Sequence, residues 1–427
     1  MTPTFREALG VWFKVGCLGF GGPAGQIALL HREVVERRGW VDEDRFAHAL
    51  SFCMLLPGPE AQQLATYLGW RMHGVRGGLA AGLLFVLPGL LLIIGLSALY
   101  VALGATPEAQ ALLLGLKAAV VALVLEALLR IGRRSLKGPG LAAVAGVAFV
   151  AVVLGAPFPL VVAAAALIGA VLPGRGEPVE GEEEPAAVRL GQTLRTALLW
   201  ALVWLAPVVL AVALFGPGST LGRMGVFFSG AALVTFGGAY AVLAYVAQAA
   251  VQDFGWLTPP QMLDGLGLAE TTPGPLILVL VFVGFVGAHA AAPPEAAWAW
   301  AVMASLLTAW ATFAPSFLWI FVGAPYLERL RRARRPAAAL RWVSAAVTGV
   351  IAQLALWFAL HLMFGDTRVL GMGPIRLETP ELASVSWPAV ALTLLACVAA
   401  FVFRLGVASL LALCLGAGFA LSFAGLL

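Results

Sequence analysis

The chain has 427 residues, of which 61% are hydrophobic and only 11% are charged, and its mean hydropathy is +0.95. Apolar runs of about 20 residues recur along it, and a run of that length can cross the hydrocarbon of a bilayer. These properties exclude a soluble globular domain and indicate a multi-pass membrane protein. The formal net charge of +4 reflects arginines in loops, so no nucleic-acid partner is expected.

The first half holds four long apolar runs and then a pair of short ones. We predict membrane spans at 13–30, 46–70, 78–103 and 110–130. The next apolar stretch, 141–172, is interrupted by Gly155-Ala156-Pro157-Phe158-Pro159. Because glycine and proline interrupt helices, this stretch is predicted to form a tight pair of short helices.

A polar segment, PGRGEPVEGEEEP at 173–185, divides the chain, because its composition cannot build a packed core. We predict a polar cytoplasmic linker over 173–190 and one extra connecting transmembrane helix at 191–215. Further spans are predicted near 224–251, 262–288, 295–322, 338–363, 385–403 and 405–427. The expected fold class is an all-α polytopic membrane protein with about thirteen transmembrane helices.

Three short motifs occur twice in the same order. The first set is Phe20-Gly21-Gly22, Gly39-Trp40 and Pro57-Gly58-Pro59, and each recurs 216 residues later, as Phe236-Gly237-Gly238, Gly255-Trp256 and Pro273-Gly274-Pro275. Further on, Ala118-Ala119-Val120 matches Ala345-Ala346-Val347 at an offset of 227. Motifs in one order at one spacing indicate an internal duplication. We therefore predict a first transmembrane repeat over 1–172 and a second over 216–427.

Lysine and arginine are distributed differently over the loops of the two halves. The loop with Arg71 and Arg76 and the loop at 130–137 are basic, so both are predicted to be cytoplasmic. Their counterpart at 289–294 holds no lysine or arginine. The counterpart at 364–384 is acid-rich and holds only Arg368 and Arg376. The second repeat is therefore predicted to be inverted, with the N-terminus of the chain cytoplasmic and its C-terminus outside.

Both PGP motifs interrupt runs that otherwise have the composition of membrane helices. A break there leaves backbone N–H and C=O groups unpaired, which hydrocarbon tolerates only beside a cavity or other protein. A half-helix that starts after such a break aims its free N–H groups and positive dipole end at the break, which suits an anion. Inverted repeats with broken helices are typical of secondary transporters. The alternative is that each PGP motif only kinks a packed helix.

Four segments resemble the paired signatures of the chromate ion transporter family: FGGPAGQIALLHREVVERRGW, LLPGPEAQQLATYLGWRMHGVRGG, FGGAYAVLAYVAQAAVQDFGWLT and LDGLGLAETTPGP. The chain resembles the long, two-domain type found in prokaryotic inner membranes. The resemblance implies export of chromate, with sulfate as the chemically similar oxyanion. It also implies that the functional elements fall on Gly21, Gly22, Pro23, Pro57, Gly58, Pro59, Gly237, Gly238, Pro273, Gly274 and Pro275.

Uncharged polar side chains beside the breaks are candidates for substrate binding. Gln62 and Gln63 offer amide donors just after the first PGP motif. Thr271 and Thr272 precede the second motif, where their hydroxyls either donate to an oxyanion or bond back to their own helix.

Four charged residues within the apolar runs are candidates for electrostatic or proton-coupling roles, because charge in a span is costly. Lys14 either extends to the cytoplasmic interface or attracts an anion, and Lys117 either pairs with another helix or adds positive potential near the path. Glu60 and Glu270 flank the PGP motifs. Since an ionised carboxylate repels a dianion, they are predicted to carry protons or to bond exposed helix ends.

The functional hypothesis is export of chromate by alternating access, driven by membrane potential, proton coupling or both. Transport of sulfate or another oxyanion, including proton-coupled uptake, is the alternative. A membrane-embedded enzyme or structural protein is disfavoured, because no catalytic motif, metal-ligand pattern or cofactor motif occurs in the sequence. The expected partners are the oxyanion, a coupling proton and membrane lipid, with ERLRRARR at 328–335 facing anionic headgroups. A homodimer is left open.

Overall fold

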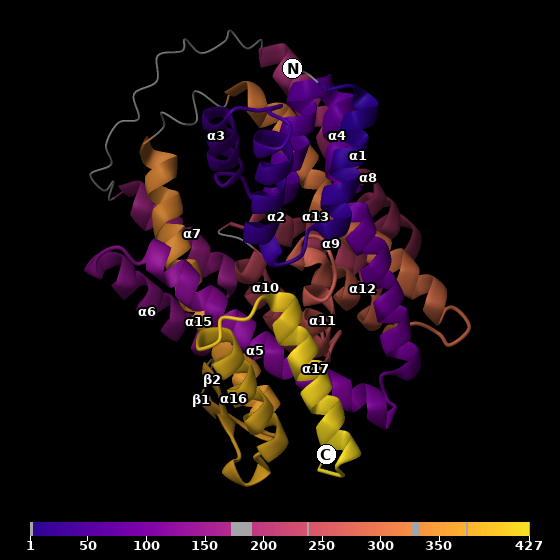
Figure 1. The fold of residues 1–427 in the computed structure, drawn as a ribbon, viewed down its shortest axis with the longest axis vertical. Coiled ribbons are helices and arrows are strands. Elements are labelled where there is room, and N and C mark those ends of the chain that lie inside the picture. The colour runs from indigo at the N-terminus through magenta and orange to yellow at the C-terminus, as the bar shows by residue number, and fades with distance from the viewer. Residues whose placement is uncertain (1–2, 172–189, 237–238, 327–333, 373–374, 427) are drawn as a thin grey trace.

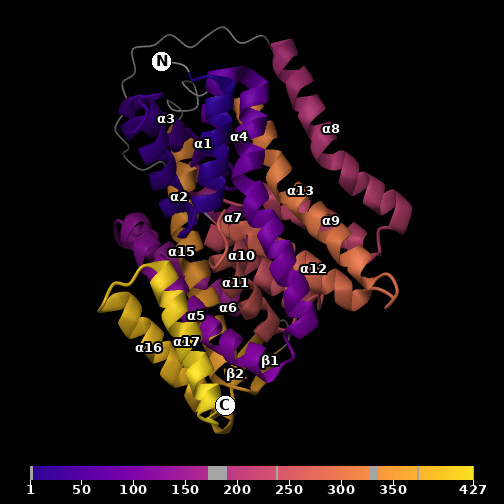
Figure 2. The same cartoon turned by 45° about the vertical axis from the view of Figure 1, so that its right-hand side comes forward.

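The computed structural model describes residues 3–171, 190–236, 239–326, 334–372 and 375–426, and almost all of its regular structure is helical (Figures 1 and 2). This confirms the predicted all-α membrane class. In this part of the chain, five helices are long and apolar enough to cross a membrane. They are α4 (Glu60–Leu103), α5 (Pro107–Ser135), α8 (Leu190–Phe215), α13 (Ala297–Gly323) and α15 (Arg334–Met363). The predicted linker, and most of ERLRRARR, lie outside the described residues.

The chain begins with two helical hairpins that turn back at the predicted breaks. Lys14 lies 2.9 Å from Glu33, which follows the second helix, so the first two helices run antiparallel. The rings of Phe52 and Tyr67 lie 6.0 Å apart across the second hairpin. The helices are α1 (Phe5–Leu18), α2 (Gly22–His31) with a π-helical turn (Arg32–Glu36), α3 (Glu43–Cys53) and the first arm of α4.

Helix α4 reverses direction at His73 and Gly74. Gly74 has a φ of 61°, and a Cβ atom on Gly78 would lie 3.1 Å from the carbonyl oxygen of Thr66. Twelve residues of straight helix would separate these positions by about 18 Å. The first arm therefore returns to the end of the molecule where the chain begins, and His73 Nε2 lies 2.9 Å from the carbonyl oxygen of Pro3.

The same order of elements recurs in the second half. Each of these elements begins 215 to 217 residues after its counterpart. They are α9 (Thr220–Leu233), α10 (Ala239–Gln248), a π-helical turn (Ala249–Asp253), α11 (Pro259–Glu270), and a short 3₁₀ turn (Leu276–Leu278) that continues into α12 (Val279–Ala291).

The paired Gly-Trp motifs close the π-helical turns. Gly39 and Gly255 have φ values of 58° and 62°, in the region where glycine carries no steric cost. Beyond them, the N–H of Trp40 donates to Val34 O at 2.8 Å and that of Trp256 to Ala250 O at 2.7 Å. These bonds satisfy carbonyls that a helix end would otherwise leave unpaired.

Two shorter helix pairs and a β-hairpin complete the fold. The predicted pair of short helices at 141–172 is observed as α6 (Pro139–Val153) and α7 (Phe158–Val171), and α16 (Trp387–Phe401) and α17 (Val407–Phe423) end the chain. Strands β1 (Thr367–Met372) and β2 (Ile375–Pro380) pair antiparallel, with Thr367 opposite Pro380. This hairpin lies in a segment that the sequence predicted only as an outside loop.

The hairpins change how the apolar runs are counted. The expected total of about thirteen treated each run as a crossing, whereas the runs at 13–30, 46–70, 224–251 and 262–288 are each two helices joined at a break. Because a hairpin enters and leaves at one end, it adds no crossing. Figure 1 places the N- and C-terminal ends of the chain at opposite ends of the molecule.

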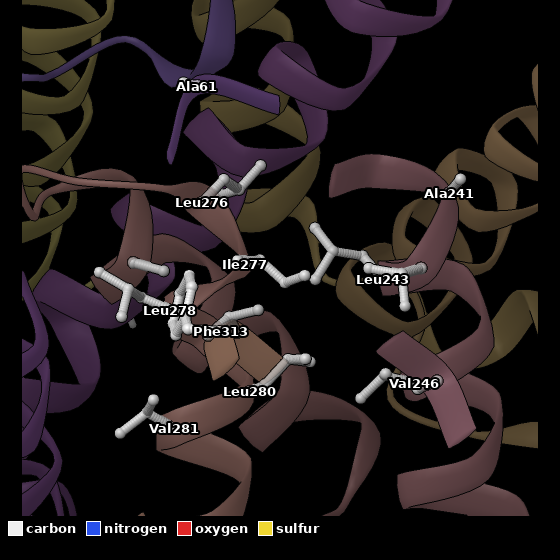
Figure 3. Packing of buried hydrophobic residues seen from close by; sticks show 14 of the residues in the cluster. Ala61, Ala241, Leu243, Val246, Leu276, Ile277, Leu278, Leu280, Val281 and Phe313 are labelled. Atoms are coloured by element: carbon white, nitrogen blue, oxygen red, sulfur yellow. The ribbon is translucent and has the colours of Figure 1, made fainter. Parts of the chain in front are cut away.

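The buried core surrounds the second break. Figure 3 shows Leu243 on one side of Ile277 and Leu278 and Phe313 on the other, with Leu276 above it. All five side chains are at least nine-tenths buried. The short turn after the second PGP motif is thus held by side chains of α10 and α13.

Candidate functional site

Each PGP break is hydrogen-bonded to the first break of the other half. The N–H of Gly58 donates to Thr235 O at 2.9 Å, and the N–H of Gly274 donates to Gly19 O at 3.0 Å. Thr235 and Gly19 are themselves 216 positions apart, so the two bonds are equivalent. Gly58 and Gly274 have φ values of 125° and 106°, which L side chains rarely adopt. The PGP motifs are therefore joints between the halves and not simple kinks in packed helices.

A buried glutamine that the sequence analysis did not select reinforces one joint. The Nε2 of Gln26 donates to Gly19 O at 3.2 Å and also to Gly274 O, while its Oε1 is buried without a partner in the described part of the chain. Its signal in the sequence was a single amide in the otherwise apolar run that follows Phe20-Gly21-Gly22.

The first turns of four helical segments line one small cavity between the joints. Helices α2, α4 and α10 and the 3₁₀ turn begin at Gly22, Glu60, Ala239 and Leu276. The residues that line the cavity include Pro23, Gln26, Pro59, Thr235, Ala239 and Pro275. The first N–H groups of a helix have no acceptor within that helix. Donors and positive dipole ends from both halves therefore gather here.

Several helices that begin away from the breaks have side-chain caps. Five of those helices begin with a side-chain oxygen that accepts from the backbone, contributed by Thr4, Asp42, Thr106, Ser219 and Thr258. By contrast, α2 and α4 begin after Gly21 and Pro59 without any side-chain cap. An uncapped first turn leaves its N–H groups available to a ligand.

The central cavity is closed in this structure. Its volume is about 20 Å³, which holds about one water molecule. A central atom with four oxygens is larger than this, so the cavity of this structure does not hold a tetrahedral oxyanion.

The predicted hydroxyl and amide donors are largely used within the protein. Thr271 Oγ1 donates to Leu268 O at 2.7 Å and Thr272 Oγ1 to Ala269 O at 2.8 Å, so both threonines bond back to their own helix. Gln63 Nε2 donates to Pro57 O at 2.8 Å inside the first PGP motif. The Oε1 atoms of Gln62 and Gln63 are buried, and neither accepts a hydrogen bond in the described structure.

The remaining glycines of the predicted site divide into two groups. Gly21 and Gly22 have φ values of 86° and 67° and turn the chain into α2 at Pro23. Gly237 and Gly238 lie outside the described residues.

Lys14 forms an ion pair that neither sequence-based alternative included. Its Nζ lies 2.9 Å from Glu33 Oε1, and the side chain of Glu33 is fully buried. Arg37 Nη1 lies 2.8 Å from the same oxygen, and Arg38 pairs with the other one. Glu33 thus joins Lys14 across the first hairpin and also pairs with two arginines that follow it in the chain. The sequence did not indicate this ion pair, because its two residues are 19 positions apart and meet only where the chain returns antiparallel.

Lys117 pairs with another helix, as one of the two alternatives proposed. Its Nζ lies 3.3 Å from Asp264 Oδ1 on α11, and the hydroxyl of Tyr100 donates to Asp264 Oδ2 at 3.1 Å. The sequence analysis missed Asp264, although a lone carboxylate in the apolar run LDGLGLAE was a usable signal.

The two candidate carboxylates have different surroundings. Tyr240 donates its hydroxyl proton to Glu270 Oε1 at 2.8 Å, and Arg130 and Glu126 lie close enough to interact electrostatically with Glu270. Glu60 lines the central cavity and makes no hydrogen bond or ion pair with the described residues. A carboxylate that faces the central cavity is thus free to exchange a proton with whatever fills it.

The fold and the site define a class: a multi-pass membrane protein whose broken helices meet at its centre, an arrangement typical of secondary transporters. The family model described as Chromate transporter matches residues 6–170 and 222–421. The chain belongs to this chromate transporter family.

Several curated relatives carry the same description. The chain is 36% identical to a chromate transport protein of Pseudomonas aeruginosa, over 82% of this chain and 79% of the relative. It is 28% identical to a probable chromate transport protein of Synechococcus elongatus, over 82% and 83%, and 28% identical to a chromate transport protein of Cupriavidus metallidurans, over 82% and 81%. No solved structure matches the chain.

Proposed function

We propose that the chain is a secondary transporter that exports chromate across a prokaryotic cytoplasmic membrane by alternating access. The observation that carries this proposal is the cavity lined by uncapped helix starts from both halves. Backbone N–H groups and helix dipoles favour an anion over a cation or a neutral solute. The relatives named as chromate transport proteins supply the identity of the oxyanion.

The proposed mechanism uses two inverted repeats that move against each other. The first repeat spans 1–172 and the second 216–427, joined by the cytoplasmic linker at 173–190 and the connecting helix at 191–215. The equivalent bonds from Gly58 and Gly274 are the contacts that break and re-form when the cavity opens. In this mechanism Gly21, Gly22, Gly237, Gly238 and the PGP motifs supply backbone to the anion, while Thr271 and Thr272 hold their own helix end.

The membrane potential is a sufficient driving force for export. Moving a dianion out of a cell with a negative interior releases about 4.6 kcal/mol per 100 mV. Proton coupling is the proposed second source, because Glu60 faces the cavity without a partner in the described structure. The same observation favours the alternative function, proton-coupled uptake of sulfate or a related oxyanion, since inward movement of a dianion requires accompanying cations.

Chromate flux in proteoliposomes tests the proposal. With an imposed potential and no pH gradient, the native chain is expected to carry radiolabelled chromate, with inhibition by sulfate. Gly58→Ala is expected to lower that flux at least about tenfold, because a Cβ atom at a φ of 125° would be strained and would lie 2.7 Å from Gln63 Nε2. Gly274→Ala should act likewise. Gly95→Ala is the matched control, because its Cβ atom would meet nothing within 4 Å.

Two results would separate the alternatives. Flux of sulfate that appears only when a pH gradient is added, with no chromate flux, would replace export with proton-coupled uptake. If a folded double variant with Gly58→Ala and Gly274→Ala carried chromate at the native rate, the joints would not take part in transport.

A further inference from the structure

A second, larger cavity lies beside α10 near the β-hairpin. Its volume is about 630 Å³. It is bounded by α10 and the π-helical turn after it, by α15, by the end of α6 and by β2. Polar residues contribute much of the wall, namely Gln248, Gln252, Asp253, Gln353 and Glu378. Amides and carboxylates are costly against lipid, so this lining suits water better than hydrocarbon.

Helix α10 connects this cavity to the central one. Ala239, the first residue of α10, lines the central cavity, and Ala244 lines the larger one. Five residues of helix correspond to about 7.5 Å. Leu243 and Val246, on another side of the same helix, are buried in the core beside Ile277 (Figure 3). The larger cavity therefore lies next to the central one, and β2, which bounds it, lies toward the C-terminal end of the molecule (Figure 1).

The charged groups of this cavity are carboxylates. Glu378 accepts from Trp357 Nε1 at 3.1 Å and from Gln252 Nε2 at 3.3 Å, and it lies 3.5 Å from His361 Nε2. Asp253 is exposed at the end of the π-helical turn. Among the described residues that line the cavity there is no lysine or arginine. A dianion in this space therefore meets amide dipoles and like charges but no lysine or arginine among the described lining residues.

The equivalent positions of the first repeat carry two arginines beside one glutamate. At the offset of 227 that relates α5 to α15, Gln353, Trp357 and Leu360 correspond to Glu126, Arg130 and Arg133. Arg130 interacts electrostatically with Glu270 at the second break, so this part of α5 also faces the centre. Equivalent positions thus present two arginines at one end of the molecule and none at the other.

On the basis of the proposed function, we propose that the 630 Å³ cavity is the outer portal through which the oxyanion leaves the central site. Its lack of cations weakens rebinding from outside, while Arg130 and Arg133 favour capture from the cytoplasmic end. The difference in charge between two equivalent faces makes the two ends of the path unequal in their affinity for a dianion.

Charged thiol reagents test the portal in vesicles of native orientation preloaded with chromate. Gln353→Cys is introduced into a chain whose four cysteines are replaced by alanine, and Leu356→Cys, at an exposed lining position, is the second variant. An impermeant anionic methanethiosulfonate added outside is expected to label both and to slow chromate efflux about tenfold more than its cationic counterpart does. Glu295→Cys, which lies outside the cavity lining, should be labelled without any change in efflux.

The portal and the proposed function fail in different ways. Complete labelling of both portal cysteines with unchanged efflux would overturn the portal, as would protection of both from the reagent while Glu295→Cys reacts. Absence of chromate efflux from vesicles that hold the folded native chain would instead overturn the proposed function, and the portal with it.

Discussion

At the residue scale, the charges inside the protein are paired across elements that are distant in sequence. Lys14 meets Glu33 across the first hairpin, and Lys117 meets Asp264 between α5 and α11. Glu60 is different, since it faces the central cavity without a partner in the described structure. Each paired charge compensates its partner's burial, and the carboxylate at the cavity is the one available to respond to a substrate or a proton.

Breaking the buried pair of Lys117 and Asp264 should destabilise the protein. Asp264→Asn and Lys117→Met are each expected to lower the free energy of unfolding by about 3 kcal/mol, because each leaves one buried charge without its partner. The loss in free energy of unfolding of the double variant should be about 1–3 kcal/mol smaller than the sum of the losses of the two single variants. Denaturation in detergent micelles measures all three. Additive effects would show that the two side chains do not interact.

His31 gives the protein a pH-dependent stability. It lies between the predicted spans, with Nε2 2.7 Å from Glu43 and Nδ1 3.1 Å from Glu36. The hydrogen bond to Glu43 raises the pKa of the His31 imidazole above its ordinary value of 6.5, and Glu36 adds to the effect. A raised pKa in the folded state means that the stabilisation is complete below the unfolded pKa and is lost as the pH rises through the folded one.

The expected measurement is a melting temperature in detergent at a series of pH values. The native chain should lose stability, relative to His31→Gln, as the pH rises from about 6 to about 8. A difference between the two chains that is independent of pH would show that the imidazolium does not contribute.

At the element scale, glycine determines where helices can turn back and cross closely. The two arms of α4 touch through their backbones, since a Cβ atom on Gly69 or Gly77 would overlap the carbonyl oxygen of the other residue. The arms hold the first residue of α4 at the central cavity, so the packing of this hairpin fixes the position of the first PGP joint.

Alanine at Gly77 should therefore separate the arms. We expect Gly77→Ala to lower the free energy of unfolding by about 1–3 kcal/mol, as overpacking of a close contact does, and to lower chromate flux as well. Gly95→Ala, in the second arm of the same helix and with open surroundings, should change neither. Equal melting temperatures for the two variants in detergent would contradict the close contact.

At the scale of the whole molecule, features that depend on local sequence could be predicted, whereas features that depend on how elements pack in space could not. Proline and glycine act where they occur, so the breaks, the duplicated motifs and the short pair at 141–172 could be located from sequence. Hydropathy measures the length of an apolar run and not its direction, so it could not distinguish a hairpin from a crossing. The contribution of Gln26 and the partner of Lys117 depend on packing between elements, which no spacing in the sequence encodes.

The arrangement of hairpins and long helices predicts the side of the membrane on which each end lies. Because the hairpins add no crossing, the chain crosses once in the second arm of α4 and once each in α5, α8, α13 and α15. An odd number of crossings places the two ends of the chain on opposite sides. The turn after α5, with Arg133, Arg134 and Lys137, falls on the side of the N-terminus, and basic loops stay cytoplasmic.

Reporter fusions measure this topology directly. Alkaline phosphatase, which is active only outside the cytoplasm, should be active when fused after Phe423 and inactive when fused after Lys137, with a fluorescent protein showing the reverse pattern. A fusion after Gly104, which lies between the second arm of α4 and α5, should also be active, because the second arm of α4 has just crossed. Activity of the phosphatase at both Gly104 and Lys137 would mean that α5 does not cross. It would also remove the inverted arrangement on which alternating access between the repeats depends.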